Sequence, residues 1–503
     1  MNDIARGEWL FNGYITSDCG AVSNIPQTHH YTNSSAATFG VTLPAGMDVG
    51  CDLLLVQPGT AAAALASGAV TGAQIDTALL HLLAVRFRLG EFDPAADQPY
   101  MRIGVEAVCS QEHTALAQDS ARQSLVLLAN PKGALPLSRA AISSVAVLGF
   151  GNSSKLINGG PNYAGIPCGG AAVTVVQALQ LAGLAVSAVP GCDSIACPTT
   201  AGFPPATAAA AAADATIVVV GLDETIEDEA LDRTYITLPG HQEDLILAAC
   251  AASKGPCTVL LMSGGGVDLT ASLASPSVAA IVYAGFMGGS GAPAFVDTLF
   301  GASAPAGRLT QTFYPADFVT QVSMEDMNMP PGPSAFPPGS SPGRTYKYYT
   351  GTPVWQFGAG LSYTTWDVSV SGPGQLPLAP VQAYLAPHSH FHGALYASRR
   401  QEPVMGQYNV TVRNTGAVDS DYVVLGFLTP PGAGTQGIPL KKLFGFDRVR
   451  VAAGQSVQVF LGVGARELTH ASKGARVPLP GLWKVTVGVE GEPHLAQMDV
   501  VVS

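Results

Sequence analysis

The chain has 503 residues, enough for about two to four domains with a sizeable buried core. Only 12 % of the residues are charged, against the usual share of about a quarter, and with 57 Gly, 37 Pro and a net charge of −12 this composition is typical of extracellular proteins and of enzymes with large loops. No basic run resembles a nucleic-acid-binding surface and no stretch is apolar for long enough to span a bilayer, so nucleic acid and membrane are excluded as partners.

Residues 1–95 have the pattern of an α/β region. The stretch "GYITSD" at 13–18 predicts a strand, and residues 59–90 predict one or two helices that end at Gly90. Asp18 stands at the carboxyl end of the expected strand, which in an α/β barrel is the catalytic side. The alternative is that Asp18 is a turn residue before Gly20.

Residues 96–117 are predicted to be a linker, and residues 118–350 an α/β sandwich domain. Apolar strands alternate here with helical segments, a pattern that favours a largely parallel sheet covered on both sides. Gly149 and Gly151 follow one strand as a partial dinucleotide fingerprint. The third glycine and the acidic residue of that fingerprint are missing, so a nucleotide site is a weak alternative.

An acidic loop at 221–240, "GLDETIEDEALDRTYITLPG", follows the apolar strand "TIVVV". It holds six carboxylates within ten residues: Asp223, Glu224, Glu227, Asp228, Glu229 and Asp232. A solvated loop is the simpler explanation, yet the rest of the chain is poor in charge. Together with Asp18, one carboxylate of this loop has the chemistry for glycoside hydrolysis, in which one acid attacks the anomeric carbon and the other protonates the leaving oxygen.

After a connector at 351–375, residues 376–503 predict a small β-sandwich. Alternating segments such as "QYNVTVRNTG" and "DYVVLGFLTP" are separated by turn signals, and no helical periodicity follows residue 364.

Eight cysteines are compatible with four disulfides or with none, and their spacing does not suggest a metal site. Cys192 with Cys197, and Cys250 with Cys257, are close enough to close small disulfide loops. The alternative for these four is buried thiols. Candidate glycosylation sequons are at Asn33, Asn152 and Asn409, and they favour secretion.

Several long stretches of the chain resemble the family-three glycoside hydrolases, in particular their β-xylosidase-like branch. They include "EWLFNGYITSDCGAV", "AGMDVGCD", "LAQDSARQSLVLLAN", "VVVGLDETIEDEALDRTYITLPGHQ", "AGFMGGSGAPAFVDTLFGASAPAGRLTQTFYP" and "GRTYKYYTGTPVWQFGAGLSYT". These stretches occur in the family's order over nearly the whole chain.

The resemblance implies a catalytic barrel, an α/β sandwich and a fibronectin type III-like domain, with no metal or cofactor. It implies that Asp18 is the nucleophile and that the acid/base residue is Glu229, with Glu227 as second choice. It also implies a disulfide between Cys19 and Cys51, which would hold the nucleophile loop still.

Only 17 residues precede Asp18 here, whereas the family's nucleophile lies late in the barrel. The expectation is therefore a barrel remnant, with the chain alone weakly active or inactive. The implied function is that of a secreted, retaining exo-β-glycosidase acting on cell-wall oligosaccharides, although the chain shows no signal peptide. A non-catalytic carbohydrate-binding or interaction remnant is the alternative, and neither the preferred glycoside nor the oligomeric state can be read from the sequence.

Overall fold

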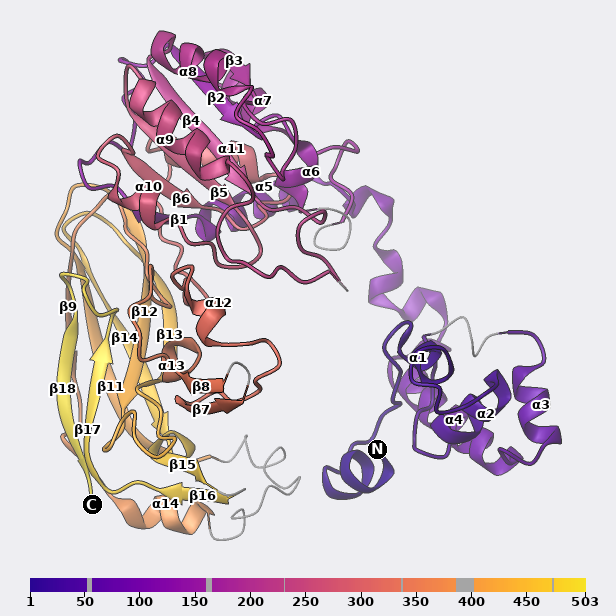
Figure 1. The fold of residues 1–503 in the computed structure, drawn as a ribbon. Coiled ribbons are helices and arrows are strands. Elements are labelled where there is room, and N and C mark those ends of the chain that lie inside the picture. Colours follow the sequence, from indigo (N-terminus) through magenta and orange to yellow (C-terminus); the bar gives the residue numbers. More distant parts are fainter. Residues whose placement is uncertain (52–56, 160–164, 230, 336–337, 386–401, 473–474) are drawn as a thin grey trace. The chain divides into compact units, whose positions relative to one another are not determined.

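The computed structural model describes residues 1–51, 57–159, 165–229, 231–335, 338–385, 402–472 and 475–503. These residues form two compact units, one made mainly of residues 1–108 and the other mainly of 109–382, 403–470 and 478–503 (Figure 1). Each unit is described by itself. No helix within the described ranges is both long and apolar enough to cross a bilayer.

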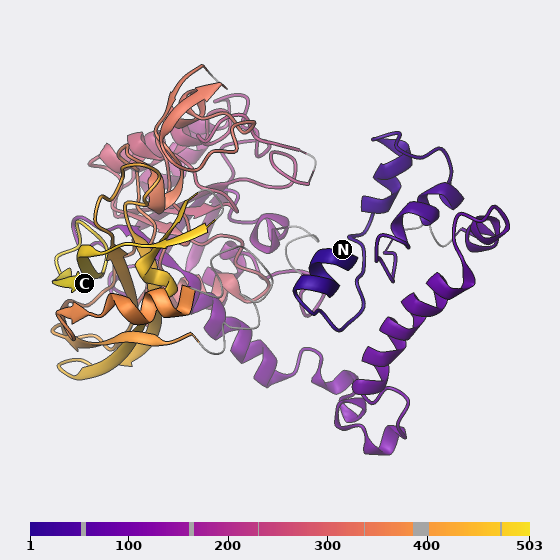
Figure 2. The same cartoon turned by 90° about the horizontal axis from the view of Figure 1, so that it is seen from below.

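The N-terminal unit is helical. Its helices are a π-helical turn (Asn2–Glu8), α1 (Ala21–Gln27), α2 (Ser35–Thr42), α3 (Thr60–Ala66) and α4 (Gly72–Arg88). Thr71 and Gln74 form a capping box that begins α4, and α4 runs as one long helix into the following short turns (Figure 2). The strand predicted at 13–18 is wrong in its extent: it is reduced to one parallel bridge between Thr16 and Val49. A β-strand forms where a neighbouring segment pairs with it along its length. Within the described residues, the segment 13–18 is paired only at Thr16.

The second unit contains a six-stranded sheet in the order β1-β6-β5-β4-β2-β3, in which all pairs are parallel except β1 with β6. The strands are β1 (Val126–Ala129), β2 (Ser144–Gly149), β3 (Ala185–Val189), β4 (Ala215–Gly221), β5 (Cys257–Met262) and β6 (Ala280–Tyr283). The helices are α5 (Gln111–Ser124), α6 (Ser154–Asn158), α7 (Val175–Leu181), α8 (Phe203–Ala212), α9 (Gln242–Ala252), α10 (Thr270–Ala274) and α11 (Gly291–Leu299).

This sheet is covered on both faces, as the alternation of strands and helices predicts (Figure 1). On β4, Ile217 and Val219 pack into one apolar cluster with α7 and α11, while Val218 and Val220 pack into another with α8 and α9. Successive residues of a strand point to opposite faces, so a strand with helices on both sides is apolar throughout. The alanine run at 208–213 lies mostly in α8, where small side chains let the helix approach the sheet.

The C-terminal part of the chain is a β-sandwich, confirming the predicted class of this region. One sheet has the order β10-β18-β17-β12-β13 and the other β14-β11-β9. The strands are β9 (Trp366–Ser371), β10 (Gln375–Leu376), β11 (Val404–Asn414), β12 (Ser420–Thr429), β13 (Lys442–Val451), β14 (Ser456–Gly464), β17 (Gly481–Val487) and β18 (Ala496–Val502). β9 lies inside the segment 351–375 that the sequence suggested as a connector.

The remaining described α-helices and strands are short, and one of them, a helix at Leu378–Leu385, contradicts the expectation that no helix follows residue 364. They are α12 (Phe318–Gln321), β7 (Gly332–Ala335), β8 (Pro338–Ser341), α13 (Thr345–Tyr348), α14 (Leu378–Leu385), β15 (Thr469–Ser472) and β16 (Ala475–Pro478).

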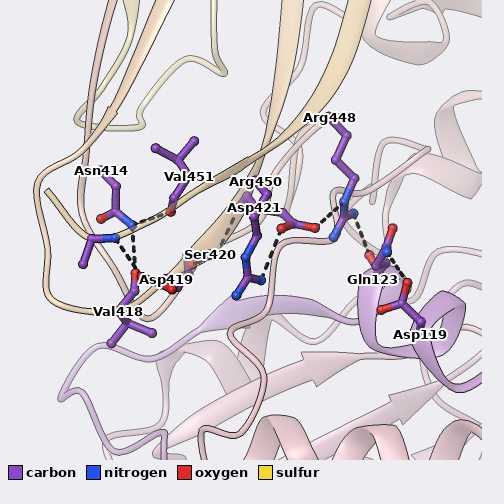
Figure 3. Close-up of polar contacts among 12 residues, drawn as sticks. Asp119, Gln123, Asn414, Val418, Asp419, Ser420, Asp421, Arg448, Arg450 and Val451 are labelled. Carbon is purple, nitrogen blue, oxygen red and sulfur yellow. Dashed lines mark hydrogen bonds and ion pairs between the residues drawn. The ribbon is translucent and has the colours of Figure 1, made fainter. Parts of the chain in front are cut away.

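Polar contacts fasten the sandwich to the α/β domain (Figure 3). Arg448 of β13 donates from Nε to Asp421 at 2.9 Å and from Nη1 to the backbone oxygen of Gln123, the residue before the end of α5, at 3.1 Å. Tyr363 donates to the backbone oxygen of Thr298 in α11 at 2.8 Å. Arg448 therefore joins the sandwich to the end of α5, and Tyr363, just before β9, joins the connecting segment to α11.

Candidate active-site residues

Asp18 lies on an exposed loop of the N-terminal unit that short-range contacts hold in place. Its Oδ1 accepts a hydrogen bond from the Cys19 backbone N–H at 2.9 Å, and a disulfide joins Cys19 to Cys51. Ser17 is bound from both sides, its N–H donating to Val49 and its Oγ accepting from the Cys51 N–H at 2.8 Å. The loop is thus tied to the segment 49–51 on each side of the carboxylate.

A buried carboxylate supports the segment that leads to Asp18. The side chain of Asp48 is 4 % exposed and accepts hydrogen bonds from the Ile15 N–H at 2.7 Å, from His81 Nδ1 at 2.8 Å and from the Arg6 guanidinium. These contacts join the start of the chain, the segment before Asp18 and helix α4. Beside them a cavity of about 750 Å³ is lined by Asp18, Ser17 and apolar side chains such as Val22 and Met47.

The acidic loop begins at the carboxyl end of β4, and Gln242 fixes its first residue. Gln242 is fully buried; its Oε1 accepts from the Gly221 N–H at 2.9 Å and its Nε2 donates to the Gly221 oxygen at 3.0 Å and to the Ile195 oxygen at 2.6 Å. A side-chain amide that satisfies both backbone groups of one residue acts as an extra strand partner at this point. The loop therefore leaves a rigid edge of the sheet.

Glu227 is held against the end of β5 by Arg233. The Arg233 Nε donates to Glu227 Oε2 at 2.9 Å, and its Nη2 donates to the backbone oxygen of Gly266 at 3.2 Å. A Cβ atom on Gly265 would lie 2.9 Å from Arg233 Nη2, so the glycines after β5 leave the space that the guanidinium occupies. The arginine side chain is 8 % exposed and that of Glu227 24 % exposed.

Glu229 lies two residues further along and is exposed. Its backbone N–H donates to Asp228 Oδ1 at 2.8 Å, and a short bridge between Asp228 and Leu231 turns the loop at this point. Ala230 lies outside the described residues. The two glutamates thus differ: Glu227 has an arginine partner and a half-buried position, whereas Glu229 faces solvent. Asp18 belongs to the other unit.

Gly149 and Gly151, the partial nucleotide fingerprint, are required by packing. Gly149 has φ 73°, and a Cβ on it would lie 2.0 Å from the Val219 backbone oxygen; a Cβ on Gly151 would lie 2.3 Å from a methyl group of Val147. Close approach of backbone segments accounts for both glycines without a nucleotide.

All eight cysteines are paired in the structure. The three pairs considered from the sequence are present: Cys19–Cys51, Cys192–Cys197 and Cys250–Cys257. The buried-thiol alternative is therefore wrong for those four residues. A fourth disulfide, Cys109–Cys168, spans 59 residues and was not foreseen. Of the sequon residues, Asn33 and Asn152 are exposed, while Asn409 is half-buried in β11.

Three residues that hold the segments of the candidate acids were not predicted from the sequence: Asp48, Gln242 and Arg233. Arg233 carried a usable signal, because a lone arginine among six carboxylates in a charge-poor chain needs partners. Gln242 and Asp48 carried none, since a single amide or acid next to an apolar segment is common at helix and strand ends.

Comparison with known proteins finds relatives that match nearly the whole chain. Residues 125–363 match the glycosyl hydrolase family 3 C-terminal domain. The chain is 38 % identical over 474 residues to β-D-xylosidase 1 of Arabidopsis thaliana, covering 91 % of this chain and 59 % of that protein. It is 36 % identical over 513 residues to an exo-1,4-β-xylosidase of Emericella nidulans, covering 99 % of this chain and 63 % of that protein.

Solved structures also superpose on nearly the whole chain. A family 3 exo-β-xylosidase bound to a xylobiose aziridine probe superposes with a TM-score of 0.83 at 32 % identity, over 97 % of this chain and 61 % of that one. A β-glucosidase of Listeria innocua shares the fold, with a TM-score of 0.77 at 21 % identity, over 99 % of this chain and 65 % of that one. The chain spans about three fifths of the length of the curated relatives named above. From these matches, residues 125–363 are similar to a family 3 glycosyl hydrolase C-terminal domain, and the chain as a whole is similar to part of the β-xylosidases named above.

Proposed function

We propose that this chain carries both acids of a retaining exo-β-glycosidase that removes β-xylosyl units from the non-reducing ends of cell-wall oligosaccharides. The observation that supports this most is the continuous relationship to β-xylosidases, which runs from the Asp18 loop through the acidic loop. The N-terminal unit is proposed to be part of a catalytic barrel, and the sandwich to be fibronectin type III-like.

The proposed reaction is a double displacement. Asp18 attacks the anomeric carbon and forms a glycosyl ester while Glu229 gives its proton to the departing glycosidic oxygen. Glu229 then takes a proton from water; the resulting hydroxide attacks the same carbon and Asp18 leaves as a carboxylate. Retention of configuration needs the two carboxyl groups about 5–5.5 Å apart. All of these roles use side chains of the protein, with no metal or cofactor.

Glu229 is preferred over Glu227 for the acid/base role because of their surroundings. Glu227 is held by Arg233 at the sheet edge, so its position is set by a contact within the loop. Glu229 is exposed, and a carboxyl that must reach a substrate oxygen needs that access. Arg233 and Glu227 then stiffen the loop that presents Glu229.

We propose an extracellular location. Four disulfides within one chain are typical of an oxidising compartment, and exposed Asn33 and Asn152 are available for glycosylation. Asn409 is half-buried, so its side chain would have to turn outward before it could be glycosylated.

The test is hydrolysis of nitrophenyl β-xyloside and of xylobiose. It uses this chain and a chimera in which the upstream residues of the Arabidopsis thaliana relative precede Met1. Activity is expected mainly in the chimera, and Asp18→Asn should lower kcat by roughly 10⁴-fold or more. Glu229→Gln should slow xylobiose cleavage by about 10²–10⁴-fold. It should slow a dinitrophenyl xyloside far less, because that leaving group needs no proton, and azide should restore turnover.

Glu227→Gln is the matched control. If Glu227→Gln alone showed azide rescue, the acid/base role would belong to Glu227. If neither the chain nor the chimera released nitrophenol, the non-catalytic alternative would replace this proposal.

A further inference from the structure

A second cavity lies in the larger unit, between the segment 345–357 and strands of the sandwich. Its volume is about 390 Å³, within the range of about 300–1,000 Å³ typical of small-molecule sites. It does not include the acidic loop or Asp18. Its lining therefore has to be explained separately from the proposed hydrolysis.

One wall of this cavity is aromatic and firmly held. Tyr346 and Phe357 stack with ring centroids 4.4 Å apart at an interplanar angle of 22°, and both rings pack edge-on against buried Phe427 of β12. The Tyr346 hydroxyl accepts a hydrogen bond from the Leu443 N–H at 3.4 Å. Tyr349 also lines the cavity. These contacts fix the aromatic wall before any ligand arrives.

The remaining lining is polar and of both charges. Lys441 Nζ lies 3.6 Å from Glu490 Oε2, and Gln356 Nε2 donates to the Glu490 backbone oxygen at 3.4 Å. The Lys441 ammonium also lies 5.1 Å from the centroid of the Phe427 ring. A cation beside an anion gives donors and acceptors together with little net charge, which suits a neutral ligand rich in hydroxyl groups.

We propose that this cavity binds a neutral pyranose unit of a glycan, at a site separate from the acids of the proposed reaction. The face of a pyranose formed by its axial C–H bonds is apolar and packs on a fixed aromatic wall, while its equatorial hydroxyls pair with donors and acceptors at the ring's edge. The cavity supplies both, with Lys441 and Gln356 as donors and Glu490 as acceptor. Such a site would keep the chain on a polysaccharide between catalytic events.

This inference goes beyond the proposed function and does not require hydrolysis. The test is calorimetric titration of the full chain with xylose, xylobiose, glucose and glucuronic acid, in the wild type and in the double variant Asp18→Asn/Glu229→Gln. A Kd on the order of 1 mM is expected for the neutral sugars, equal in both proteins. Binding that disappears in the double variant would place the sugar at the catalytic acids and overturn the inference.

Cavity variants localise the site. Ala433→Trp should fill the cavity and abolish binding, and Lys441→Met should weaken it by roughly tenfold through loss of a charged donor. Lys484→Met, on the exposed side of β17, is the matched control and should leave the Kd unchanged. Thermal unfolding of each variant checks that the fold is intact.

The inference fails if no neutral sugar binds the wild type saturably, if well-folded Ala433→Trp and Lys441→Met both bind as tightly as the wild type, or if glucuronic acid binds more tightly than xylose. Nitrophenyl xyloside hydrolysis is measured in parallel. If neither the unsubstituted chain nor the chimera showed that activity while sugar binding was kept, the proposed function alone would be rejected.

Discussion

The acidic loop follows a strand in which every residue is buried, whereas Asp18 follows a segment whose neighbours are largely exposed. All seven residues of β4 are buried, and helices cover both faces of its sheet. Near the start of the chain, Leu10 is 76 % exposed and Trp9 52 % exposed. The segments that carry the two carboxylates of the proposed reaction therefore differ in how deeply the residues around them are buried.

This difference shows two ways of holding the acids of the proposed reaction. The loop that carries Glu229 takes its rigidity from the packed sheet, through Gln242 and Arg233. The Asp18 loop depends on local ties, namely the Cys19–Cys51 disulfide and the contacts of Asp48. Because misplacement by about 1 Å can cost a hundredfold in rate, those ties matter more where the core is small.

A pair of identical substitutions gives the largest contrast between the regions. Leu260→Ala in β5 removes a fully buried side chain from the sheet core and should lower the free energy of unfolding by about 3 kcal/mol. Leu89→Ala, at a position 72 % exposed, should change it by less than about 0.5 kcal/mol. Urea denaturation measures both. Equal losses would mean that the two regions do not differ in packing.

Removing the amide that clamps the acidic loop should have the next largest effect. Gln242→Ala leaves both backbone groups of Gly221 and the Ile195 oxygen without that partner, which should cost about 2 kcal/mol. Amide hydrogen exchange in the loop 222–240 should become faster. Gln180→Ala, at an exposed position of α7, is the control and should alter neither quantity. Unchanged exchange in Gln242→Ala would show that the loop is held by other contacts.

The smallest effect concerns pH. Asp214 accepts hydrogen bonds from Ser144, Ser143 and Lys254, and these hold the pKa of its carboxyl well below the ordinary value of 3.8. The folded state binds this proton less readily than the unfolded state, so the stabilisation is present above about pH 4 and is lost as the pH falls further.

Asp214→Asn should therefore melt below the wild type at pH 7, and the two melting curves should approach each other toward pH 2. Asp244→Asn, at an exposed position paired with His241, is a comparison variant that should change the melting temperature little. A difference for Asp214→Asn that stays constant from pH 7 to pH 2 would contradict the assignment.

Strands β2, β4, β5 and β6 of the large sheet were predictable because a run buried on both faces is apolar at every position, whereas β1 was predicted as the end of the preceding helix. β3 was missed because its side chains are mostly exposed, and β13 because its charged residues interrupt the alternation. The segment 13–18 has the composition of a strand, but a strand is completed by its neighbour. Local sequence carries no information about that partner.

For the candidate site, the candidate acids could be chosen from the sequence, but the contacts that hold their loops could not. The acidic loop stood out through its charge, and the resemblance singled out Asp18. The contact of Arg233 with Glu227 requires the loop to turn back on itself, and the Cys109–Cys168 disulfide joins residues 59 positions apart. Such contacts depend on how distant segments meet, which spacing along the chain does not determine.

The most direct test of the two-step mechanism is to trap its covalent intermediate. A dinitrophenyl 2-deoxy-2-fluoro-β-xyloside forms the ester and releases it slowly, so it is incubated with whichever form, chain or chimera, hydrolyses nitrophenyl xyloside. Peptide mass spectrometry should find one fluoroxylosyl group on Asp18, and none in Asp18→Asn. A label on any other carboxylate, or turnover without a trapped ester, would contradict the account.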